Sequence, residues 1–461
     1  MNVLAGVDVG TTSVKVVLMT ADGVELSHGH ASTRWSQTSE GTQTDALSII
    51  DSVNLALRSA LDSVPGVKVA AVGVASMAEA GVLVDVHDVP VAPVIAWHDS
   101  RDVSELDSLR AELGEQEFSR RTGLPVWTQW SLTKHRWLYD NIAEVRRATR
   151  RYTIADYVVR SLGASPSCEL SLASRTGWLE LRTKTWWEPA LSWSRATEAL
   201  MPELVQAGTP VGRVAKADGF PELSGAVLTV AGHDHQAATV GVGVFGEGEE
   251  LDSCGTAEAI LRTVNPDLPD TALSALTSAG VTVGWHVVAD RWCLLGGTQA
   301  GLVLQQLMAQ LGAERSDLPQ LDALAAAAIP GAACVAFDGN AVTVSVDGAS
   351  DRGSVWRAAT VAVTDMARAV SDAIDGATGP RTALVVTGGW SHSSALMAAK
   401  RQAFGALWRT DTTEAGARGA ALLAGLANGT YLTYADFPQR ERVEVAAAAT
   451  TGTDPQERSI S

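Results

Sequence analysis

The chain has 461 residues, which at about 150 residues per domain predicts two or three domains. Hydrophobic residues make up 46% and charged residues 19%, a globular composition that excludes a disordered chain. The formal net charge of −17 argues against nucleic acid and anionic membrane surfaces as partners. No apolar run reaches the roughly 18 residues of a membrane helix, and the N-terminus lacks the pattern of a signal peptide. Cys168, Cys254, Cys293 and Cys334 show no CxxC spacing, which indicates reduced thiols in a cytoplasmic protein.

The first half of the chain begins with a hairpin pattern. Apolar runs at 4–9 and 14–19 flank the turn Gly10-Thr11-Thr12-Ser13. Apolar residues at steps of three and four predict a helix over 44–63. The next elements expected are a strand at 68–75, helices near 103–120 and 132–149, and a strand at 227–231. Strands mixed with helices predict an α/β domain with a mixed sheet.

A second cycle begins near residue 249. Strands expected at 250–253 and 258–263 enclose a turn at Gly255-Thr256. The elements expected after it are strands at 282–288, 292–296 and 383–387, and helices at 299–311, 355–376, 391–404 and 414–428. After about residue 440 the composition predicts a frayed tail.

Both cycles place Gly-Thr in a turn between two strands, which indicates an approximate internal repeat. Two similar domains facing each other would form a cleft with one such turn from each side. Small residues in these turns would let backbone N–H groups approach phosphate oxygens. The turns alone leave coincidence open, because Gly-Thr is common in ordinary hairpins.

Two aspartates stand at strand ends. Asp8 lies beside the first turn, where a carboxylate suits a phosphate site if Mg²⁺ lies between them. The alternative is an Asp that caps the turn. Asp234 follows the strand at 227–231 and is placed to act as the general base of phosphoryl transfer to an alcohol. His233 and His235 would then hydrogen-bond a polyhydroxylated ligand, whereas the alternative for Asp234 is a helix N-cap.

Other residues are candidates for ligand contact. Thr387-Gly388-Gly389 before a helix could receive adenine or ribose against bare backbone, or could be a turn that needs glycine for its torsions. Trp97, Trp127 and Trp130 are candidates for stacking on a sugar or for packing. Lys15 points away from its apolar strand neighbours and is given no phosphate role.

Nine segments in a fixed order carry a family resemblance. They are VDVGTTSVKVVLMTADG (7–23), SMAEAGVLVD (76–85), IAWHDSR (95–101), TGLPVWTQWSLTK (122–134), ADYVVRSLGA (155–164), AGHDHQAATVGVG (231–243), SCGTAEAI (253–260), VVTGGWSHSSALMAAKRQAFG (385–405) and EAGARGAALLAG (414–425). Together they resemble the FGGY carbohydrate kinase family, which includes xylulokinase, fuculokinase and glycerol kinase.

The resemblance implies two ribonuclease-H-like α/β domains of the actin-like ATPase superfamily, with mixed sheets and an active site in the cleft between them. It implies a sugar-binding domain over 1–245 that carries the base, a nucleotide-binding domain over 246–435, and a tail over 436–461. Asp234 looks like the catalytic base, and Asp8 with Asp234 like the metal site. The residues implied for ATP binding are Thr11, Thr12, Ser13, Gly255, Thr256, Gly297, Gly388 and Gly389. Those implied for substrate binding are Ala78, Glu79, Trp97, Asp99, Gln129, His233 and His235.

The activity that the resemblance implies is transfer of the γ-phosphate of ATP, with Mg²⁺, to a terminal hydroxyl of a ketose or polyol, as in a xylulokinase. The alternative is a catalytically inactive sugar- or nucleotide-binding member of the superfamily, and a homodimer is the candidate assembly. Ala78 stands where glycerol kinase has an Arg, and Gln129 where it has a substrate-facing Tyr, which argues against glycerol kinase itself. The QMHG of xylulokinase is absent. The segment after Pro330 is short, so the outer wall of the nucleotide cleft is expected to differ.

Overall fold

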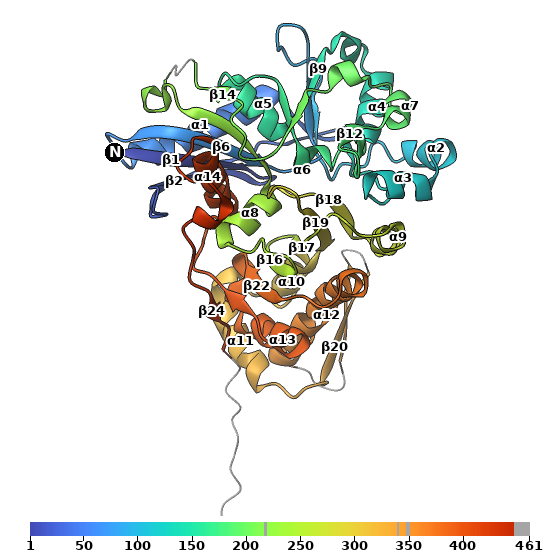
Figure 1. Cartoon of the computed structure of the whole chain (residues 1–461). Coiled ribbons are helices and arrows are strands. Elements are labelled where there is room, and N and C mark those ends of the chain that lie inside the picture. The colour runs from blue at the N-terminus through green and yellow to red at the C-terminus, as the bar shows by residue number, and fades with distance from the viewer. Residues whose placement is uncertain (216–218, 339–340, 347–350, 447–461) are drawn as a thin grey trace, which may run out of the picture.

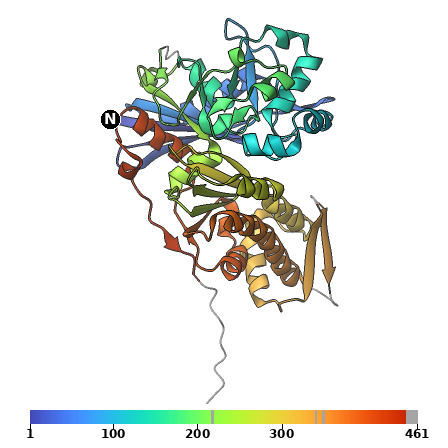
Figure 2. The ribbon, with the colours of Figure 1, turned by 45° about the vertical axis from the view of Figure 1, so that its right-hand side comes forward.

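Two mixed β-sheets with flanking helices build two lobes, one from each half of the chain (Figure 1). The structure, a computed structural model, describes residues 1–215, 219–338, 341–346 and 351–446. The turned view keeps the two lobes apart, with the first above the second (Figure 2). Among the described residues, no helix is both long and apolar enough to cross a membrane.

The first sheet has the strand order β14-β15-β6-β1-β2-β3. β1 to β3 form an antiparallel meander, and β6 and β15 lie parallel to β1. Most residues of β1, β6 and β15 are buried, as expected for a sheet covered on both faces. The bounds are β1 (Asn2–Val9), β2 (Ser13–Met19), β3 (Glu25–Ser32), β6 (Lys68–Ser76), β14 (Gly212–Arg213) and β15 (Val227–His233).

The second sheet repeats this arrangement in the order β18-β19-β17-β16-β22-β23-β24. β16, β17 and β19 form the antiparallel meander, and β22 and β23 continue parallel to β16. Because the two Gly-Thr turns close the first hairpin of each sheet, the topology confirms the predicted pair of related α/β domains. The bounds are β16 (Glu249–Cys254), β17 (Glu258–Val264), β18 (Thr282–Trp285), β19 (Trp292–Thr298), β22 (Ala383–Thr387), β23 (Trp408–Arg409) and β24 (Val443–Glu444).

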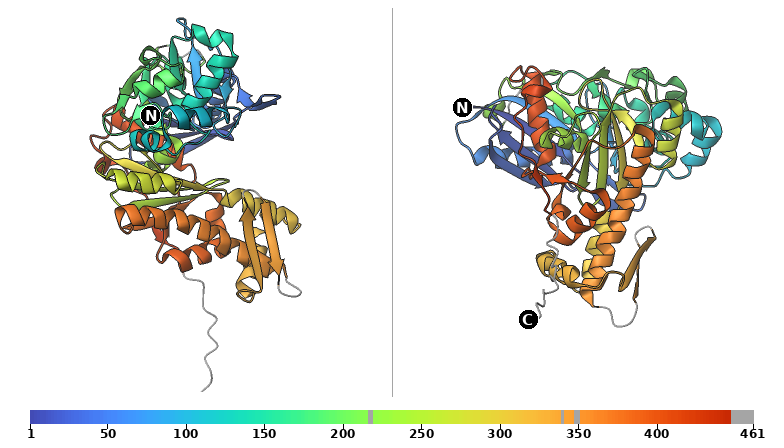
Figure 3. Two further views of the ribbon diagram at one scale, coloured as in Figure 1. Left: turned by 90° about the vertical axis from the view of Figure 1, so that its right-hand side faces the viewer. Right: turned by 60° about the horizontal axis from the view of Figure 1, so that its bottom comes forward.

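Helices cover both sheets, and short strands decorate the lobes. The helices are α1 (Ala46–Asp62), α2 (Glu105–Glu112), α3 (Glu115–Thr122), α4 (Ser131–Asn141), α5 (Ile154–Ser161), α6 (Leu170–Ala173), α7 (Glu188–Trp193), α8 (Asp234–Val242), α9 (Asp270–Ser278), α10 (Ala300–Gln310), α11 (Leu318–Ala327), α12 (Arg352–Thr378), α13 (Ser394–Phe404) and α14 (Ala415–Ala427). The short strands are β4 (Ser36–Thr38), β5 (Gly41–Thr44), β7 (Gly81–Val84), β8 (Val94–Ile95), β9 (Arg150–Thr153), β10 (Ser167–Glu169), β11 (Leu179–Glu180), β12 (Thr185–Trp186), β13 (Glu203–Val205), β20 (Ala333–Asp338) and β21 (Ala341–Val346). The last two form a hairpin beside α12 (Figure 3).

Two helices cross between the lobes. α14, from the end of the second half, packs on the first sheet, and α8, from the end of the first half, contacts the second lobe (Figure 1). A Cβ atom at Gly419 would lie 1.8 Å from the carbonyl oxygen of Ala237, and one at Gly6 would lie 1.8 Å from that of Ala417. The Ala- and Gly-rich sequence of α14 is therefore what lets its backbone touch both α8 and β1.

The structure differs from the sequence-based expectations in several places. The helix expected over 132–149 ends at Asn141, and a short 3-10 helix follows over Ala143–Arg147. The helix expected over 103–120 is two helices, α2 and α3, separated at Gly114. α11 and the β20–β21 hairpin have no expected counterpart. The first part of the expected tail is packed against the rest of the protein, because Phe437 is buried in a core and β24 pairs with β23. The remainder of the expected tail, 447–461, lies outside the described residues.

Candidate active site

Two neighbouring cavities contain most of the predicted site residues. A cleft of about 1170 Å³ is lined by Thr12, Gly255, Thr256, Gly388 and Gly389. A pocket of about 330 Å³ lies on the other side of the β16–β17 turn, which contributes Ala257 and Glu258 to it. The predicted residues that line this pocket are Thr11, Ala78, Glu79, Trp97, Gln129, His233, Asp234, His235 and Gly297.

The larger cleft is built from bare backbone. Gly388 has φ 84°, and a Cβ atom there would lie 2.6 Å from the carbonyl carbon of Cys254. Only glycine allows this turn to close against the β16–β17 hairpin. Ser13, predicted to bind nucleotide, is not among the residues that line the cleft; its carbonyl oxygen accepts from Gly10 N at 3.1 Å and closes the first turn.

Lys15, for which the sequence predicted no phosphate role, lines the same cleft. Lys15 and Asp8 are paired across β1 and β2, so their side chains share one face of the sheet. The Nζ atom of Lys15 lies 3.0 Å from Oε2 of Glu414. The side chain of Lys15 points away from its buried strand neighbours, as expected, and on that side of the sheet it lines the cleft.

The smaller pocket contains two residues that were expected at the nucleotide. Thr11 and Gly297 line it together with the predicted substrate residues. The indole Nε1 of Trp97 donates to Oγ1 of Thr11 at 2.8 Å. The first Gly-Thr turn thus has Thr12 in one cavity and Thr11 in the other.

Asp234 is the first residue of α8, directly after β15. The helix N-cap is His233, so Asp234 does not have the capping role that was its alternative. Burial raises the pKa of Asp234, but the charge and the backbone N–H of His235 outweigh burial and hold it below its ordinary value. Burial lowers the pKa of His233 to about 3, which leaves that imidazole neutral. Asp234 is therefore an ionised acceptor whose side chain is 21% exposed.

Asp8 has the features of a metal ligand. Its Oδ1 atom is buried and has no hydrogen-bond partner among the described residues. Burial, reinforced by the charge of Asp234, raises the pKa of Asp8 to about 7, although Lys15 opposes the shift. A Cβ atom at Gly416 would lie 2.5 Å from Oδ2 of Asp8, so glycine leaves room beside this carboxylate. An unpartnered carboxylate oxygen close to a second carboxylate fits Mg²⁺.

Asp99 does not join the pocket. Its Oδ1 accepts from the backbone N and from Nε of Arg101, both at 2.9 Å, and its Oδ2 accepts from Thr42 N. The side chains of Asp99 and Arg101 are each only 3% exposed. The prediction of substrate binding by Asp99 is therefore corrected: its oxygens are used to hold β5 against the segment after β8.

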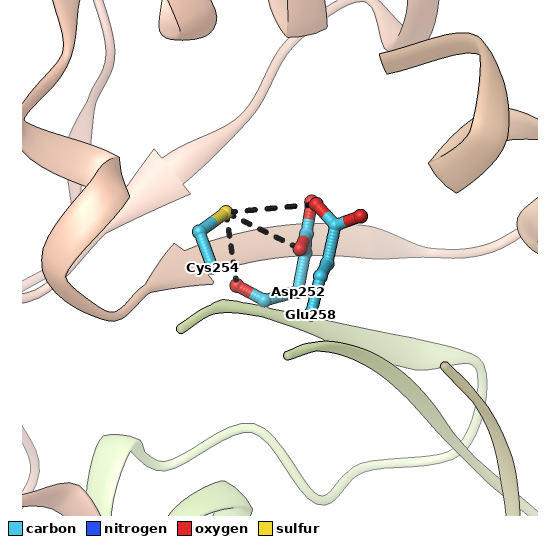
Figure 4. Close-up of side chains that lie close together, drawn as sticks. All are labelled: Asp252, Cys254 and Glu258. Atoms are coloured by element: carbon cyan, nitrogen blue, oxygen red, sulfur yellow. Dashed lines mark hydrogen bonds between the residues drawn. The ribbon is translucent and has the colours of Figure 1, made fainter. Parts of the chain in front are cut away.

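A second carboxylate cluster lies beneath the β16–β17 turn. Asp252, Cys254 and Glu258 point toward one another in a way that could hold a cation (Figure 4). The Nζ atom of Lys400, on α13, already contacts Oδ2 of Asp252 and lies 2.6 Å from Oε1 of Glu258. The ammonium group supplies the positive charge that a metal would bring, so this cluster is an internal ion pair. Burial raises the pKa of the Cys254 thiol, which makes it unreactive.

Two arginines at the cavities were missed from the sequence. Arg175 lines the smaller pocket and is paired with Glu79. Arg315 lines the cleft, with its Cζ atom 3.7 Å from the ring centroid of Trp390, and its Nη2 donates to Gly389 O at 2.6 Å. Neither arginine lies in a recognisable functional sequence motif. Their positions at the cavities depend on the folded structure, so the sequence alone did not indicate them.

Two similar α/β lobes, each with a Gly-Thr turn in the first hairpin of its sheet, form a ribonuclease-H-like, actin-like fold. Comparison with solved structures supports this fold. A ligand-bound xylulose kinase from Lactobacillus acidophilus superposes with a TM-score of 0.86 at 20% identity, covering 97% of this chain and 94% of that one. A Plasmodium falciparum glycerol kinase with ADP gives a TM-score of 0.84 at 17% identity, covering 97% and 94%.

The sequence comparisons identify the family. The model of the FGGY family of carbohydrate kinases, N-terminal domain, matches residues 3–241. A glycerol kinase from Pseudarthrobacter chlorophenolicus is 27% identical over 453 residues, covering 92% of this chain and 89% of the relative. The chain belongs to the FGGY family of carbohydrate kinases. It is a phosphotransferase that uses ATP with Mg²⁺.

Proposed function

We propose that this kinase phosphorylates a terminal hydroxyl of a neutral ketose or polyol, with Asp234 as the general base. The observation that carries the proposal is the position of Asp234 in the smaller pocket, which Ala257 and Glu258 also line, while the preceding Gly255 and Thr256 line the nucleotide cleft. A base must lie within reach of the hydroxyl whose proton it accepts, and the transferred phosphate must approach from the opposite side.

The roles of the other residues follow from the two cavities. Glu79, Gln129, Trp97, His233 and His235 would bind the sugar, because they give the smaller pocket hydroxyl-binding groups around Asp234. The ionised state of Asp234 suits proton acceptance as the hydroxyl attacks.

On the nucleotide side, Thr12, Gly255 and Thr256 would bind phosphate oxygens through hydroxyl and backbone N–H groups, and Lys15 would add positive charge. Gly388 and Gly389 would receive the nucleoside. Asp8, with Asp234, would hold Mg²⁺ and leave the nearby Gly-Thr turns free for phosphate. The metal supplies charge neutralisation of the phosphate oxygens when it is bound.

The substrate class follows from the charges around the pocket. Glu79 and Asp234 both line it, and Arg175 is already paired with Glu79. A sugar acid would bring its carboxylate next to two others, whereas a neutral polyol can donate hydroxyl protons to both. The charges therefore favour a neutral ketose or polyol over a sugar acid, and among these we propose a xylulokinase-like activity. We also propose that 1–245 bind sugar, that 246–435 bind nucleotide, and that the protein is cytoplasmic and forms a homodimer.

The test is a coupled assay of ADP release across tetruloses, pentuloses, hexuloses and alditols. Sugar-dependent ADP release by the wild type is expected, and Asp234→Asn should lower kcat about 10²- to 10⁴-fold while nucleotide still binds. Asp267→Asn, which removes an exposed carboxylate, is the matched control and should keep wild-type kcat. A kcat near that of the wild type in Asp234→Asn would remove Asp234 from the role of base. No observation favours the catalytically inactive alternative.

A further inference from the structure

We propose that Arg175 is a specificity-determining residue of the sugar site, because it fixes the Glu79 carboxylate with one oxygen saturated and the other open to a substrate hydroxyl. This inference rests on the proposed function. Arg175 follows α6, and Glu79 lies between β6 and β7, so the two come from distant parts of the first lobe. Both line the smaller pocket.

The hydrogen bonds to Glu79 are strongly asymmetric. Oε1 of Glu79 accepts from Nε of Arg175 at 2.8 Å and from Nε2 of Gln129 at 3.1 Å, and it lies 2.7 Å from Nη2 of Arg175 in the ion pair. Among the described residues, no donor reaches Oε2. The side chains of Arg175 and Glu79 are 7% and 4% exposed, so the pair is shielded from bulk water. One oxygen of a buried carboxylate is thus left to accept from a ligand.

Arg175 is itself held by contacts with both lobes. Its Cζ atom lies 4.9 Å from the ring centroid of Trp130, a cation–π contact within the first lobe. Its Nη1 donates to Oγ1 of Thr282, on β18 of the second lobe, at 2.6 Å. These contacts leave the guanidinium little freedom to release Glu79.

The backbone of Glu79 is also constrained. Its φ of 64° lies in the left-handed region, which is unfavourable for a non-glycine residue. Its carbonyl oxygen accepts from Oγ of Ser131 at 2.5 Å and from Nη2 of Arg151 at 3.1 Å. The surrounding hydrogen bonds therefore hold an unfavourable conformation that turns the side chain toward Arg175 and the pocket.

The arrangement selects a chemical group. Burial holds the pKa of Glu79 above its ordinary value, and the charge and hydrogen bond of Arg175 oppose this rise, so Arg175 is the group that favours the carboxylate form. A carboxylate oxygen can only accept a hydrogen bond. Oε2 therefore recognises an O–H donor, and the substrate must carry such a hydroxyl in addition to the one that Asp234 deprotonates. A sugar lacking it would leave Oε2 unpaired, which is the arrangement that gives strong discrimination.

The test uses the neutral sugar of the panel with the highest wild-type kcat/KM, each of its monodeoxy analogues, and D-gluconate. The wild type should prefer the parent sugar over one particular monodeoxy analogue by roughly 10- to 100-fold. Arg175→Met should raise KM for the parent roughly 10-fold, leave KM for ATP within about threefold, and remove the discrimination against that analogue. Arg175→Lys, which keeps the positive charge, should retain part of the discrimination against that analogue. Arg182→Met, which removes an arginine whose side chain is 38% exposed, is the control.

A purely structural role for Arg175 predicts a different result, and that result would overturn the proposal. Arg175→Met would then lower kcat/KM equally for the parent and every analogue. Glu79→Gln keeps the shape of the side chain and guards against misfolding of the Arg175 variants. The Glu79→Gln variant should lose discrimination at the same hydroxyl as Arg175→Met. Loss of discrimination at a different hydroxyl, or a preference of the wild type for D-gluconate, would also overturn the inference. Failure of the proposed function is distinct, because then no panel member stimulates ADP release by the wild type.

Discussion

Replacing Asp8 with Asn is expected to stabilise the metal-free protein while lowering its activity. The pKa of Asp8 is raised by burial and by Asp234 from the ordinary 3.8 to about 7. Between these values the unfolded chain has lost the proton that the folded chain keeps, so the free energy of unfolding falls as the pH rises from about 4 to 7. At 1.36 kcal/mol per pKa unit, the cost of charging Asp8 is at most about 4 kcal/mol above pH 7 and roughly 2 kcal/mol at pH 5.

Urea denaturation in EDTA at pH 5 and pH 8 measures this difference. Asp8→Asn removes the charge, so its gain over the wild type should be larger at pH 8 than at pH 5. Asp51→Asn, which removes an exposed carboxylate on α1, should change the free energy of unfolding by no more than about 0.5 kcal/mol. An Asp8→Asn protein that is no more stable than the wild type at pH 8, or that gains equally at both pH values, would refute the reasoning.

Three further substitutions test the surroundings of the site. Lys400→Met leaves two buried carboxylates without their cation and should lower the free energy of unfolding by about 3–5 kcal/mol in chemical denaturation, whereas exposed Lys68→Met should be near neutral. Gly388→Ala should raise KM for ATP by roughly 10-fold or more in steady-state kinetics with little change in KM for the sugar, because its Cβ overlaps the adjacent backbone at φ 84°. An unchanged KM for ATP would contradict the assignment of that turn. Gly419→Ala should destabilise by about 1–3 kcal/mol or more in thermal unfolding, while Gly376→Ala, which meets open space on α12, should be neutral or stabilising.

The fold could be predicted from the sequence because the turn and periodicity patterns that indicate it are local and occur in both halves of the chain. The two Gly-Thr turns each stand between apolar runs, and the helical spacing over 44–63 matches α1. The glycine turns and Asp234 could be predicted to line the cavities because each lies at a strand end, where the sequence pattern changes. What the sequence could not supply is which cavity a side chain enters, as Thr11 and Thr12 demonstrate by lining different ones.

The errors have physical causes of the same kind. The position of Asp99 suggested a substrate-binding residue, but Arg101, two residues later, forms an ion pair with its carboxylate. No pattern in the sequence predicts that pairing. Arg175 reaches Glu79 across 96 residues of chain, and Lys400 reaches Glu258 across 142. Pairings over such separations depend on the folded topology rather than on spacing.

The first sheet is covered by α14, a helix from the second half of the chain, and this affects how the protein folds during synthesis. Leu4, Val17 and Ala71 of the first sheet belong to the same core as Ala417, Ala420 and Leu423 of α14. During synthesis from the N-terminus, this part of the first sheet stays uncovered until α14 has emerged from the ribosome. A chain cut short before α14 would therefore expose that apolar surface to aggregation.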